Sequence, residues 1–270
     1  MGGVPGGSVY GDGAPIADTV DDVLYQTERW GAFSYAVPVP DGHYILTLKL
    51  AEIYWSGPGR RVFDIWVEGR EVVSDLDIAA RAGKARAYDL QIPARVQDGT
   101  LNLVFKADMD YAKLSGFVVQ EWSEVFGWGV NAGGGRYVDG SGRVYESDML
   151  FSGGRTYSAE APIAGTEDAQ LYRTERFGDF SYDIPLPNGT YEVTLKFAEI
   201  YWNQPARRLF GLRIEGEPVL SNFDILSFVG KNESYDYPVF VHVADGVLNL
   251  AFQTRVDHAK VSAILVRRVP

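Results

Sequence analysis

A long internal repeat is the feature that most constrains the fold of this chain. The segment Leu48–Trp55 (LKLAEIYW) returns almost unchanged as Leu195–Trp202 (LKFAEIYW), at an offset of 147 residues (195 minus 48). A period of this length far exceeds the unit of a solenoid, so it indicates two tandem domains. We place these domains at residues 1–122 and 123–270.

The two copies differ in how they begin. The second copy opens with Val130–Gly135, whereas everything before its Phe151 lacks a counterpart in the first copy, which starts near Gly6. We therefore expect the first domain to lack an N-terminal edge strand that the second domain has. The junction Glu121–Trp128 holds two Trp and one Phe, so we expect it to pack on the domains and to keep them in a fixed relation.

The composition excludes several classes of function. The 270 residues are 46% hydrophobic and 23% charged, as in ordinary soluble domains, and the net charge of -11 argues against nucleic-acid binding. The chain has no Cys, which removes disulfides and Cys-ligated metals. No apolar run is long enough to span a membrane, no signal peptide is visible, and no cofactor motif is found.

Apolar and polar residues alternate along many short segments, which is the pattern of half-buried β-strands. In the second copy Tyr191, Val193, Leu195 and Phe197 alternate with polar neighbours. Turn dipeptides such as Glu68-Gly69 separate the segments in both copies, and no window has a helical period. Many short strands with regular turns predict an all-β chain of two antiparallel β-sandwiches of the jelly-roll type.

Carboxylates inside the repeated motifs raise the question of catalysis. Glu28 and Glu52 recur as Glu175 and Glu199. A glycoside hydrolase or lyase would need two carboxylates facing each other across a cleft. Each acid instead has an arginine near it in the repeat, so we expect a half-buried network of these acids with Arg29, Arg61, Arg176 and Arg208. With no nucleophile or phosphate-loop motif either, we predict no catalytic residues and no enzyme.

Neither histidines nor acidic clusters predict a metal site. His43, His242 and His258 occupy positions that hold other residues in the opposite copy. The runs Asp75–Asp77 and Asp108–Asp110 could offer oxygens to calcium, but their counterparts in the second copy each lose an acid. We therefore predict that the chain holds no metal.

Aromatic residues that do not fit a core predict a sugar site. The repeated segment reads as a strand that stops on two adjacent rings, and successive strand residues point to opposite faces, so one ring must leave the core. Rings stack on the apolar faces of sugars, while a carboxylate binds hydroxyls. Residues of this kind, all expected outside strand interiors, are Tyr10, Trp30, Tyr54, Trp55 and Asp110, and in the second copy Tyr157, Phe177, Tyr201, Trp202 and Asp257.

Both copies resemble the malectin domain family over nearly the whole chain. The motifs that carry this resemblance are Leu24–Arg29 (LYQTER), Phe33–Tyr35 with Pro38 and Pro40, Gly42–Tyr44, Leu50–Tyr54 (LAEIY), Arg61–Asp64 (RVFD), Asp75–Ile78 (DLDI) and, in the second copy, Asn131–Gly134 (NAGG). The resemblance implies a β-sandwich module that binds carbohydrate without catalysis. Its ligands would be glucose-containing di- or oligosaccharides or a glucan, and the ten residues above match the positions of its ligand contacts.

The resemblance also implies a setting and leaves alternatives open. We expect an extracellular or cell-surface location within a larger carbohydrate-active or surface protein, an oligosaccharide or polysaccharide ligand, and possible contacts with other domains of that protein. Because the first copy lacks its opening strand, its Tyr10 loop should hang from a free end, so we expect the second site to dominate binding. The alternatives are a protein-interaction or structural module without sugar binding and, less in keeping with the acids, a β-sandwich hydrolase or lyase.

Overall fold

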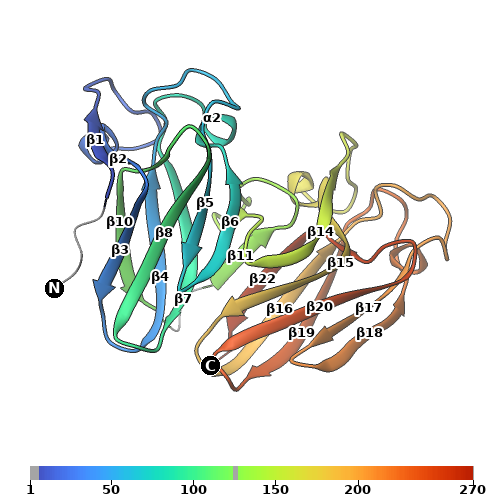
Figure 1. Cartoon of the computed structure of the whole chain (residues 1–270). Coiled ribbons are helices and arrows are strands. Elements are labelled where there is room, and N and C mark those ends of the chain that lie inside the picture. The colour runs from blue at the N-terminus through green and yellow to red at the C-terminus, as the bar shows by residue number, and fades with distance from the viewer. Residues whose placement is uncertain (1–5, 124–126, 270) are drawn as a thin grey trace. The chain divides into compact units, whose positions relative to one another are not determined.

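The structure, a computed structural model, describes residues 6–123 and 127–269. The chain forms two compact units, Met1–Trp122 (unit 1) and Ser123–Pro270 (unit 2) (Figure 1). The expectation that the junction packs on both domains falls partly on residues 124–126, which lie outside the described residues. Within the described part, Trp122 donates its backbone N–H to the carbonyl oxygen of His43, and the Trp128 side chain is buried.

Unit 1 is a β-sandwich of two main sheets and one small sheet. The main sheets have the strand orders β3-β8-β5-β6 and β10-β4-β7, and the small sheet has the order β1-β2-β9. The elements of unit 1 are β1 (Ser8–Gly11), α1 (Asp22–Tyr25), β2 (Thr27–Gly31), β3 (Phe33–Pro38), β4 (Gly42–Leu50), β5 (Val62–Val67), β6 (Arg70–Leu76), α2 (Ile78–Arg81), β7 (Tyr88–Val96), β8 (Thr100–Met109), β9 (Ala112–Leu114) and β10 (Gly116–Glu121).

Unit 2 repeats this sandwich and extends it. Its sheets have the orders β14-β15-β20-β17-β18, with β21 beside β15, and β12-β13-β11-β22-β16-β19. The elements of unit 2 are β11 (Gly127–Asn131), β12 (Tyr137–Val138), β13 (Val144–Ser147), β14 (Phe151–Ser158), η1 (Ala169–Tyr172), β15 (Thr174–Pro185), β16 (Gly189–Phe197), β17 (Leu209–Ile214), β18 (Glu217–Phe223), η2 (Ile225–Ser227), β19 (Tyr235–Val243), β20 (Val247–Val256), β21 (Lys260–Val261) and β22 (Ala263–Arg268).

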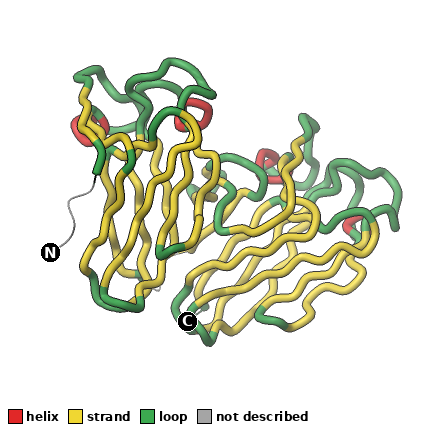
Figure 2. The backbone as a smooth tube through the Cα atoms, in the orientation of Figure 1, coloured by secondary structure: helices red, strands yellow, loops and turns green. Residues whose placement is uncertain are grey.

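The predicted all-β tandem sandwich is confirmed, and the alternating pattern is its cause. In β16 the side chains of Tyr191, Val193, Leu195 and Phe197 are fully buried, while the residues between them are half-buried or exposed. The strand pairs are antiparallel except that β11 and β13 run parallel, which the turn pattern did not predict. In each unit the longer loops and short helices gather at one end of the sandwich (Figure 2).

Two sequence expectations about strand ends are wrong. The repeated segment does not stay extended up to its aromatic pair, because β4 ends at Leu50 and β16 at Phe197. Tyr10 lies in β1 and is paired with Glu28 of β2, so it does not hang in a loop, and Trp30 also lies within β2. In unit 2 Tyr157 lies in β14 and Phe177 in β15, so these residues too are not outside the strands as expected. Among the described residues no helix is both long and apolar enough to cross a membrane.

Candidate functional site

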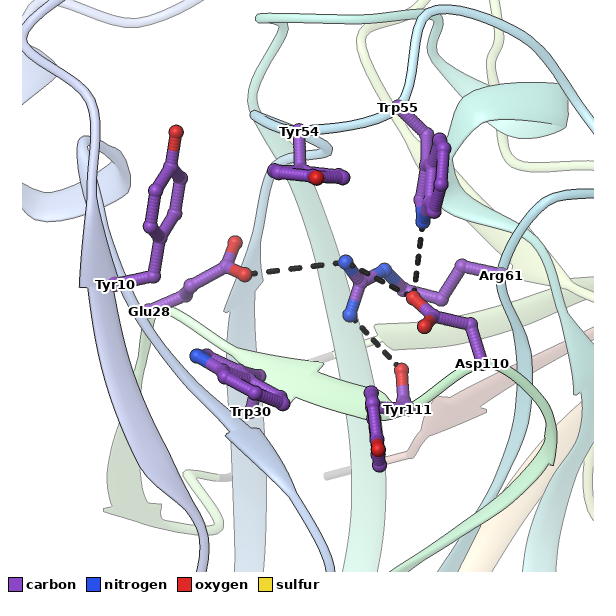
Figure 3. Close-up of a pocket in the computed structure, with 8 residues that line it drawn as sticks. All are labelled: Tyr10, Glu28, Trp30, Tyr54, Trp55, Arg61, Asp110 and Tyr111. Atoms are coloured by element: carbon purple, nitrogen blue, oxygen red, sulfur yellow. Dashed lines mark hydrogen bonds and ion pairs between the residues drawn. The ribbon is translucent and has the colours of Figure 1, made fainter.

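A pocket at the loop end of unit 1 brings together the five residues that were singled out in that copy. The cavity has a volume of about 240 Å³ (Figure 3). Its walls come from β1, from β2, from the loop after β4, from Arg61, which directly precedes β5, and from the turn between β8 and β9. The lining residues are Tyr10, Glu28, Trp30, Tyr54, Trp55, Arg61, Asp110 and Tyr111.

The loop after β4 is folded by a buried carboxylate. One oxygen of Glu52, Oε1, accepts hydrogen bonds from the backbone N–H groups of Tyr54 (2.9 Å) and Trp55 (3.0 Å). The two rings then stand at 87° to each other with centroids 4.8 Å apart, and both line the pocket. This turn, and not the two-residue alternation of a strand, is what takes both rings out of the core.

Arg61 links the same carboxylate to the pocket. Its Nε donates to Glu52 Oε2 at 2.9 Å, its Nη1 donates to the carbonyl oxygen of Tyr111 at 3.0 Å, and its Nη2 lies 3.4 Å from Asp110 Oδ2. The guanidinium is buried, and its planar fork suits several acceptors at once. Arg61 therefore holds the β8–β9 turn and its acidic residue in place from below.

Asp110 is the polar feature that a ligand would meet. Its backbone has φ 59°, a left-handed conformation that Asp tolerates better than most residues, and this directs the carboxylate into the pocket. Oδ2 accepts a hydrogen bond from the indole Nε1 of Trp55 at 2.9 Å. Among the described residues Oδ1 receives no hydrogen bond, so one oxygen is fixed and the other can accept from a ligand.

The pocket walls are aromatic on two sides. Tyr10 and Tyr54 meet edge to face with centroids 5.8 Å apart, and Trp30 and Tyr111 lie 4.9 Å apart at 58°. Tyr54 is 54% exposed, as is expected of a ring that is free to contact a ligand. Figure 3 shows these rings surrounding the charged group at the floor.

Unit 2 contains the same construction. The indole of Trp202 donates to Asp257 Oδ2 at 3.0 Å, and Arg208 Nε donates to Glu199 Oε2 at 2.7 Å. Glu199 Oε1 again accepts the N–H groups of Tyr201 and Trp202. The cavity of about 260 Å³ is lined by Tyr157, Glu175, Phe177, Tyr201, Trp202, Arg208, Asp257 and His258.

All ten residues singled out in the sequence thus lie in two pockets, and their role in binding stays a prediction. The sequence did not indicate three of the lining positions in each unit, nor the lysine buried beneath each pocket, Lys113 or Lys260. The missed lining residues are Glu28, Arg61 and Tyr111, and in unit 2 Glu175, Arg208 and His258. Their repetition at the same offset was a signal for the first two positions, which had been assigned to the scaffold alone.

The acids do pair with cations, although not all with the predicted ones. Glu52 pairs with Arg61 as expected, but Glu28 contacts the fully buried Lys113 instead of Arg29. In unit 2 Lys260 takes the same place against Glu175, and Arg176 pairs with Asp148. Arg29 and Arg176 point away because neighbouring strand residues face opposite sides of the sheet.

Burial controls the charge of this network. Burial raises the pKa of the Glu28 carboxyl despite the opposing pull of Lys113, and burial lowers the pKa of Lys113 despite Glu28 and Glu52. For Glu199 burial acts in the same upward direction, but the charges of Lys260 and Arg208 outweigh it and leave its pKa below the ordinary value. The pKa values of Glu28 and Glu199 are therefore shifted in opposite directions.

Three acids of unit 1 lie close together outside the pocket. Carboxylate oxygens of Asp64, Asp75 and Asp108 all lie within 4.8 Å of one another. Asp77, from the run considered for calcium, instead caps α2 by accepting the N–H of Ala80 at 2.9 Å. Acidic groups near the surface are common without an ion, and three carboxylates offer at most six of the six to eight oxygens that calcium takes, so the cluster alone does not make a site.

Comparison with known proteins agrees with the repeat. The model of the malectin domain family matches residues 9–117 and 126–264. Malectin-B of Xenopus laevis is 35% identical over 148 residues, covering 52% of this chain and 54% of that protein, and human malectin is 42% identical over 101 residues, covering 36% of this chain and 35% of that protein. The matched regions are thus about half, or less, of these curated relatives.

Solved structures show the same tandem fold. The ANX1 ectodomain from Arabidopsis thaliana has a TM-score of 0.50 at 14% identity, with 100% of this chain and 90% of that chain covered. At this identity the likeness concerns the fold only. Because the family model matches both repeats and most of the chain, this protein belongs to the malectin domain family.

Proposed function

We propose that each unit is a non-catalytic carbohydrate-binding module whose pocket holds a neutral, glucose-containing saccharide. Membership of the malectin family supports a carbohydrate-binding or ectodomain role. The observation that carries the finer proposal is the shared carboxylate, Asp110 or Asp257, which an indole and an arginine hold among exposed rings.

The pocket suits the two kinds of surface that a sugar presents. The apolar C–H faces of a pyranose can stack on Tyr10, Tyr54 or Trp30, because such rings offer flat and polarizable surfaces. The hydroxyl rim can donate to Asp110 Oδ1, and a hydrogen bond to an ionised acceptor is stronger than a neutral one. The combination of apolar walls with few fixed polar groups is typical of small-molecule sites.

The charges below the floor favour neutral sugars over acidic ones. Glu28, Glu52 and Asp110 stand against Arg61 and Lys113, which leaves one formal negative charge in the network. A uronate or sulfated sugar would bring a further negative charge to a partly desolvated place, which is costly. Neutral hexoses carry no such cost.

The same pairing argues against catalysis. A glycosidase needs one carboxyl that can hand a proton to the substrate and a second that faces it. Glu28, the acid whose pKa burial raises, contacts buried Lys113 and has only 2% of its side chain exposed. Glu52 is bound on both oxygens by the loop and by Arg61. Both acids are thus engaged in holding the floor together, and neither faces a second carboxyl group that is free to act with it.

A second hollow in unit 1 gives room for more than one sugar ring. It has a volume of about 600 Å³ and shares Asp110 and Tyr111 with the first pocket. Phe33, Phe105 and Lys106 are among its other lining residues. A disaccharide could place one ring in each hollow with Asp110 between them, so we expect disaccharides to bind more tightly than glucose.

The expected affinity is weak. A disaccharide has about 23 heavy atoms, and roughly 0.3 kcal/mol per atom sets a ceiling near 7 kcal/mol, or about 10 µM. Desolvation of its hydroxyls should bring one site to about 0.1–1 mM. Nanomolar binding of a disaccharide by one unit would contradict the proposed site.

A glycan array followed by calorimetry tests the proposal. We expect neutral glucose-containing glycans to bind the chain, the single variants Asp110→Ala and Asp257→Ala each to remove one site, and the double variant to remove both. Glu217→Ala changes an exposed acid outside both pockets and serves as the control. Unchanged binding by the double variant would place the ligand elsewhere, and a blank array would favour a protein-interaction module.

We further propose that this function is exercised outside the cell or at its surface, as part of a larger protein. The support is the likeness in fold to a protein whose structure is described as an ectodomain. Detection of the protein in the surface and medium fractions of its source cells would agree with this, whereas detection in the cytosol alone would contradict it.

A further inference from the structure

One strand of unit 1 has a neighbour on one side only within the described part of the chain. β10 pairs with β4, whereas its counterpart in unit 2, β22, pairs with β16 on one side and β11 on the other. Among the described residues no strand of unit 1 takes the place beside β10 that β11 takes beside β22. The edge of β10 that faces away from β4 is therefore unpaired within the described residues, whereas the equivalent edge of β22 is covered by β11.

The side chains of β10 show the same difference in exposure. Val118 is 43% exposed, and its counterpart Leu265 is 3% exposed. Phe117 is only half-buried, whereas the equivalent Ile264 is fully buried. An apolar edge strand of this kind is a template for pairing with another strand.

The backbone of β10 is oriented to accept a strand. Trp122 donates its N–H to His43 of β4, so in an antiparallel ladder the N–H groups of Glu121 and Val119 point away from β4. In unit 2 the same edge of the strand faces β11, because Val266, the counterpart of Val119, stands opposite Trp128 of β11. Val119 and Glu121 thus offer the hydrogen-bonding groups that β22 gives to β11.

Side chains beside this edge match those that anchor the segment in unit 2. Arg176 and Tyr182 both bind the carboxylate of Asp148, each at 2.7 Å. Their counterparts in unit 1 are Arg29 and Tyr35, which are only half-buried. Thr174 also donates to Asn131 at 2.9 Å, and its counterpart Thr27 is exposed.

The segment that fills the edge in unit 2 has a distinct chemistry. Trp128 is 1% exposed and Val130 fully buried, and they alternate with a glycine that packs closely. A Cβ on Gly129 would lie 2.9 Å from the Tyr145 ring, so this position requires glycine. Asp148 closes the segment with the carboxylate that Arg176 binds.

We propose that the β10 edge of unit 1 is an acceptor site for one extended polypeptide segment with the chemistry of residues 127–148, supplied from outside residues 6–122. The segment would add as an antiparallel strand beside β10, place an aromatic residue and a β-branched residue on its inner face, and present a carboxylate to Arg29 and Tyr35. Main-chain hydrogen bonds would give affinity, and these side chains would give specificity.

A peptide in trans tests the site. A synthetic peptide of residues 127–149 is titrated into the full chain, and hydrogen exchange is read residue by residue. We expect saturable binding, with the Val119 and Glu121 amides slowed at least tenfold. A peptide with Ser in place of Trp128 and Asn in place of Asp148 should bind at least tenfold more weakly. No slowing at β10, or slowing only at β22 through exchange with β11, would overturn the proposal.

The variant Val119→Pro separates the edge from the fold. Proline removes an N–H that points away from β4, and proline is tolerated on edge strands at such positions. We expect the variant to fold, as shown by unchanged protection of β4, and to lose peptide binding. Retained binding would overturn the proposed strand pairing.

A gain of stability gives a readout that does not depend on peptide solubility. A copy of residues 127–148 is joined directly before Gly2 of the full chain, so that the added aspartate takes the place equivalent to Asp148. We expect slower exchange throughout unit 1 and no change in unit 2, and Val119→Pro should cancel the gain. An added segment that leaves unit 1 unchanged would contradict the proposal, as would a chain alone that dimerises through β10, since the occupant would then be a second copy.

Discussion

The first and second pockets share the groups that hold the carboxylate and differ in one wall. Tyr10, Tyr54, Trp55, Arg61 and Asp110 recur as identical residues in unit 2. The wall that differs is Trp30 with Tyr111 in unit 1 and Phe177 with His258 in unit 2. If the pockets bind sugars as proposed, we expect the shared frame to determine whether a sugar binds, and the variable wall to determine which sugar or orientation each unit prefers.

The second wall is also more basic than the first. The guanidinium of Arg155 lies over the Phe177 ring, 5.1 Å from its centroid. The counterpart of Arg155 in unit 1 is Ser8, which stands opposite Trp30 in the sheet. Unit 2 therefore surrounds a smaller ring with cationic and imidazole groups, where unit 1 has a broader apolar surface.

Removal of the buried arginine should have the largest effect and should act equally in both units. Arg61→Ala leaves Glu52 buried without its main partner, and Arg208→Ala does the same to Glu199, so each should destabilise its own unit by about 3–5 kcal/mol. Denaturant unfolding followed by NMR signals from each unit measures this. The exposed neighbours Arg60→Ala and Arg207→Ala are controls with expected changes within about 0.5 kcal/mol. A loss of stability in one unit only would show that the buried arginine does not contribute equally to the two units.

Loss of the indole N–H should have the next largest effect, on binding and not on folding. Trp202→Phe keeps a ring in the wall but removes the hydrogen bond to Asp257, which should weaken disaccharide binding by unit 2 about fivefold, or about 1 kcal/mol. Trp55→Phe should do the same in unit 1. Calorimetry on each variant measures the change, with Trp66→Phe outside the pocket as the control. Equal affinity in the variant and the parent would mean that the indole does not position the carboxylate for the ligand.

Exchange of the variable wall should have a smaller effect on affinity and should reverse preference. Tyr111→His combined with Trp30→Phe should give pocket 1 the glycan ranking of pocket 2, with affinity changes of about 2- to 10-fold. The reverse pair, His258→Tyr with Phe177→Trp, should do the opposite. Arrays are compared with the other pocket silenced by its aspartate-to-alanine change. An unchanged ranking in both would show that the wall does not select the ligand.

The smallest expected effect is a change of stability with pH, which should have opposite signs for the two buried acids Glu28 and Glu199. Glu28 has a pKa above the ordinary 4.5 in the folded state, so its protonation favours folding, and unit 1 should gain stability as pH falls toward 4.5. Glu199 has a folded pKa below 4.5, so the stability that it contributes is present above pH 4.5 and is lost as pH falls through its folded pKa.

The variants Glu28→Gln and Glu199→Gln isolate these two groups from the other acids of each unit. In Glu28→Gln the rise in stability as pH falls toward 4.5 should flatten, and in Glu199→Gln the fall in stability below pH 4.5 should flatten. Unit-resolved unfolding over this pH range provides the measurement. Identical slopes in variant and parent would refute the assigned directions.

Much of the fold could be predicted because strand alternation and tight turns depend on residues that are close together in the sequence. Alternating apolar residues placed the strands, and Glu68 and Gly69 do form a turn with φ of 51° and 74°, as a tight hairpin requires. The strand ends were less predictable. Glu52 ends the extended run by accepting two N–H groups of its own loop, and no pattern of apolar residues reveals such a bond.

The site was predictable in its rings and less so in its floor. An aromatic residue in the position of Tyr54 does not fit the core, so the sequence already indicated an exposed ring. In the structure the Tyr54 side chain is half-exposed. Lys113 did not stand out, because lysine is usually at the surface, yet it is fully buried against Glu28. Its repetition as Lys260, again between apolar residues, was the available signal. That Tyr10 belongs to a strand depends on pairing with β2, which is a non-local contact.

The chain of contacts from Glu52 through Arg61 to Asp110 has a consequence for timing. Because the indole and the guanidinium already hold the carboxylate, a ligand does not have to wait for the site to assemble. Association at about 10⁵–10⁷ M⁻¹s⁻¹ with a Kd of about 0.1–1 mM gives dissociation at about 10–10⁴ s⁻¹. Each encounter would last about 0.1–100 milliseconds. Lasting attachment to a glycan surface would then come from rapid rebinding at two pockets.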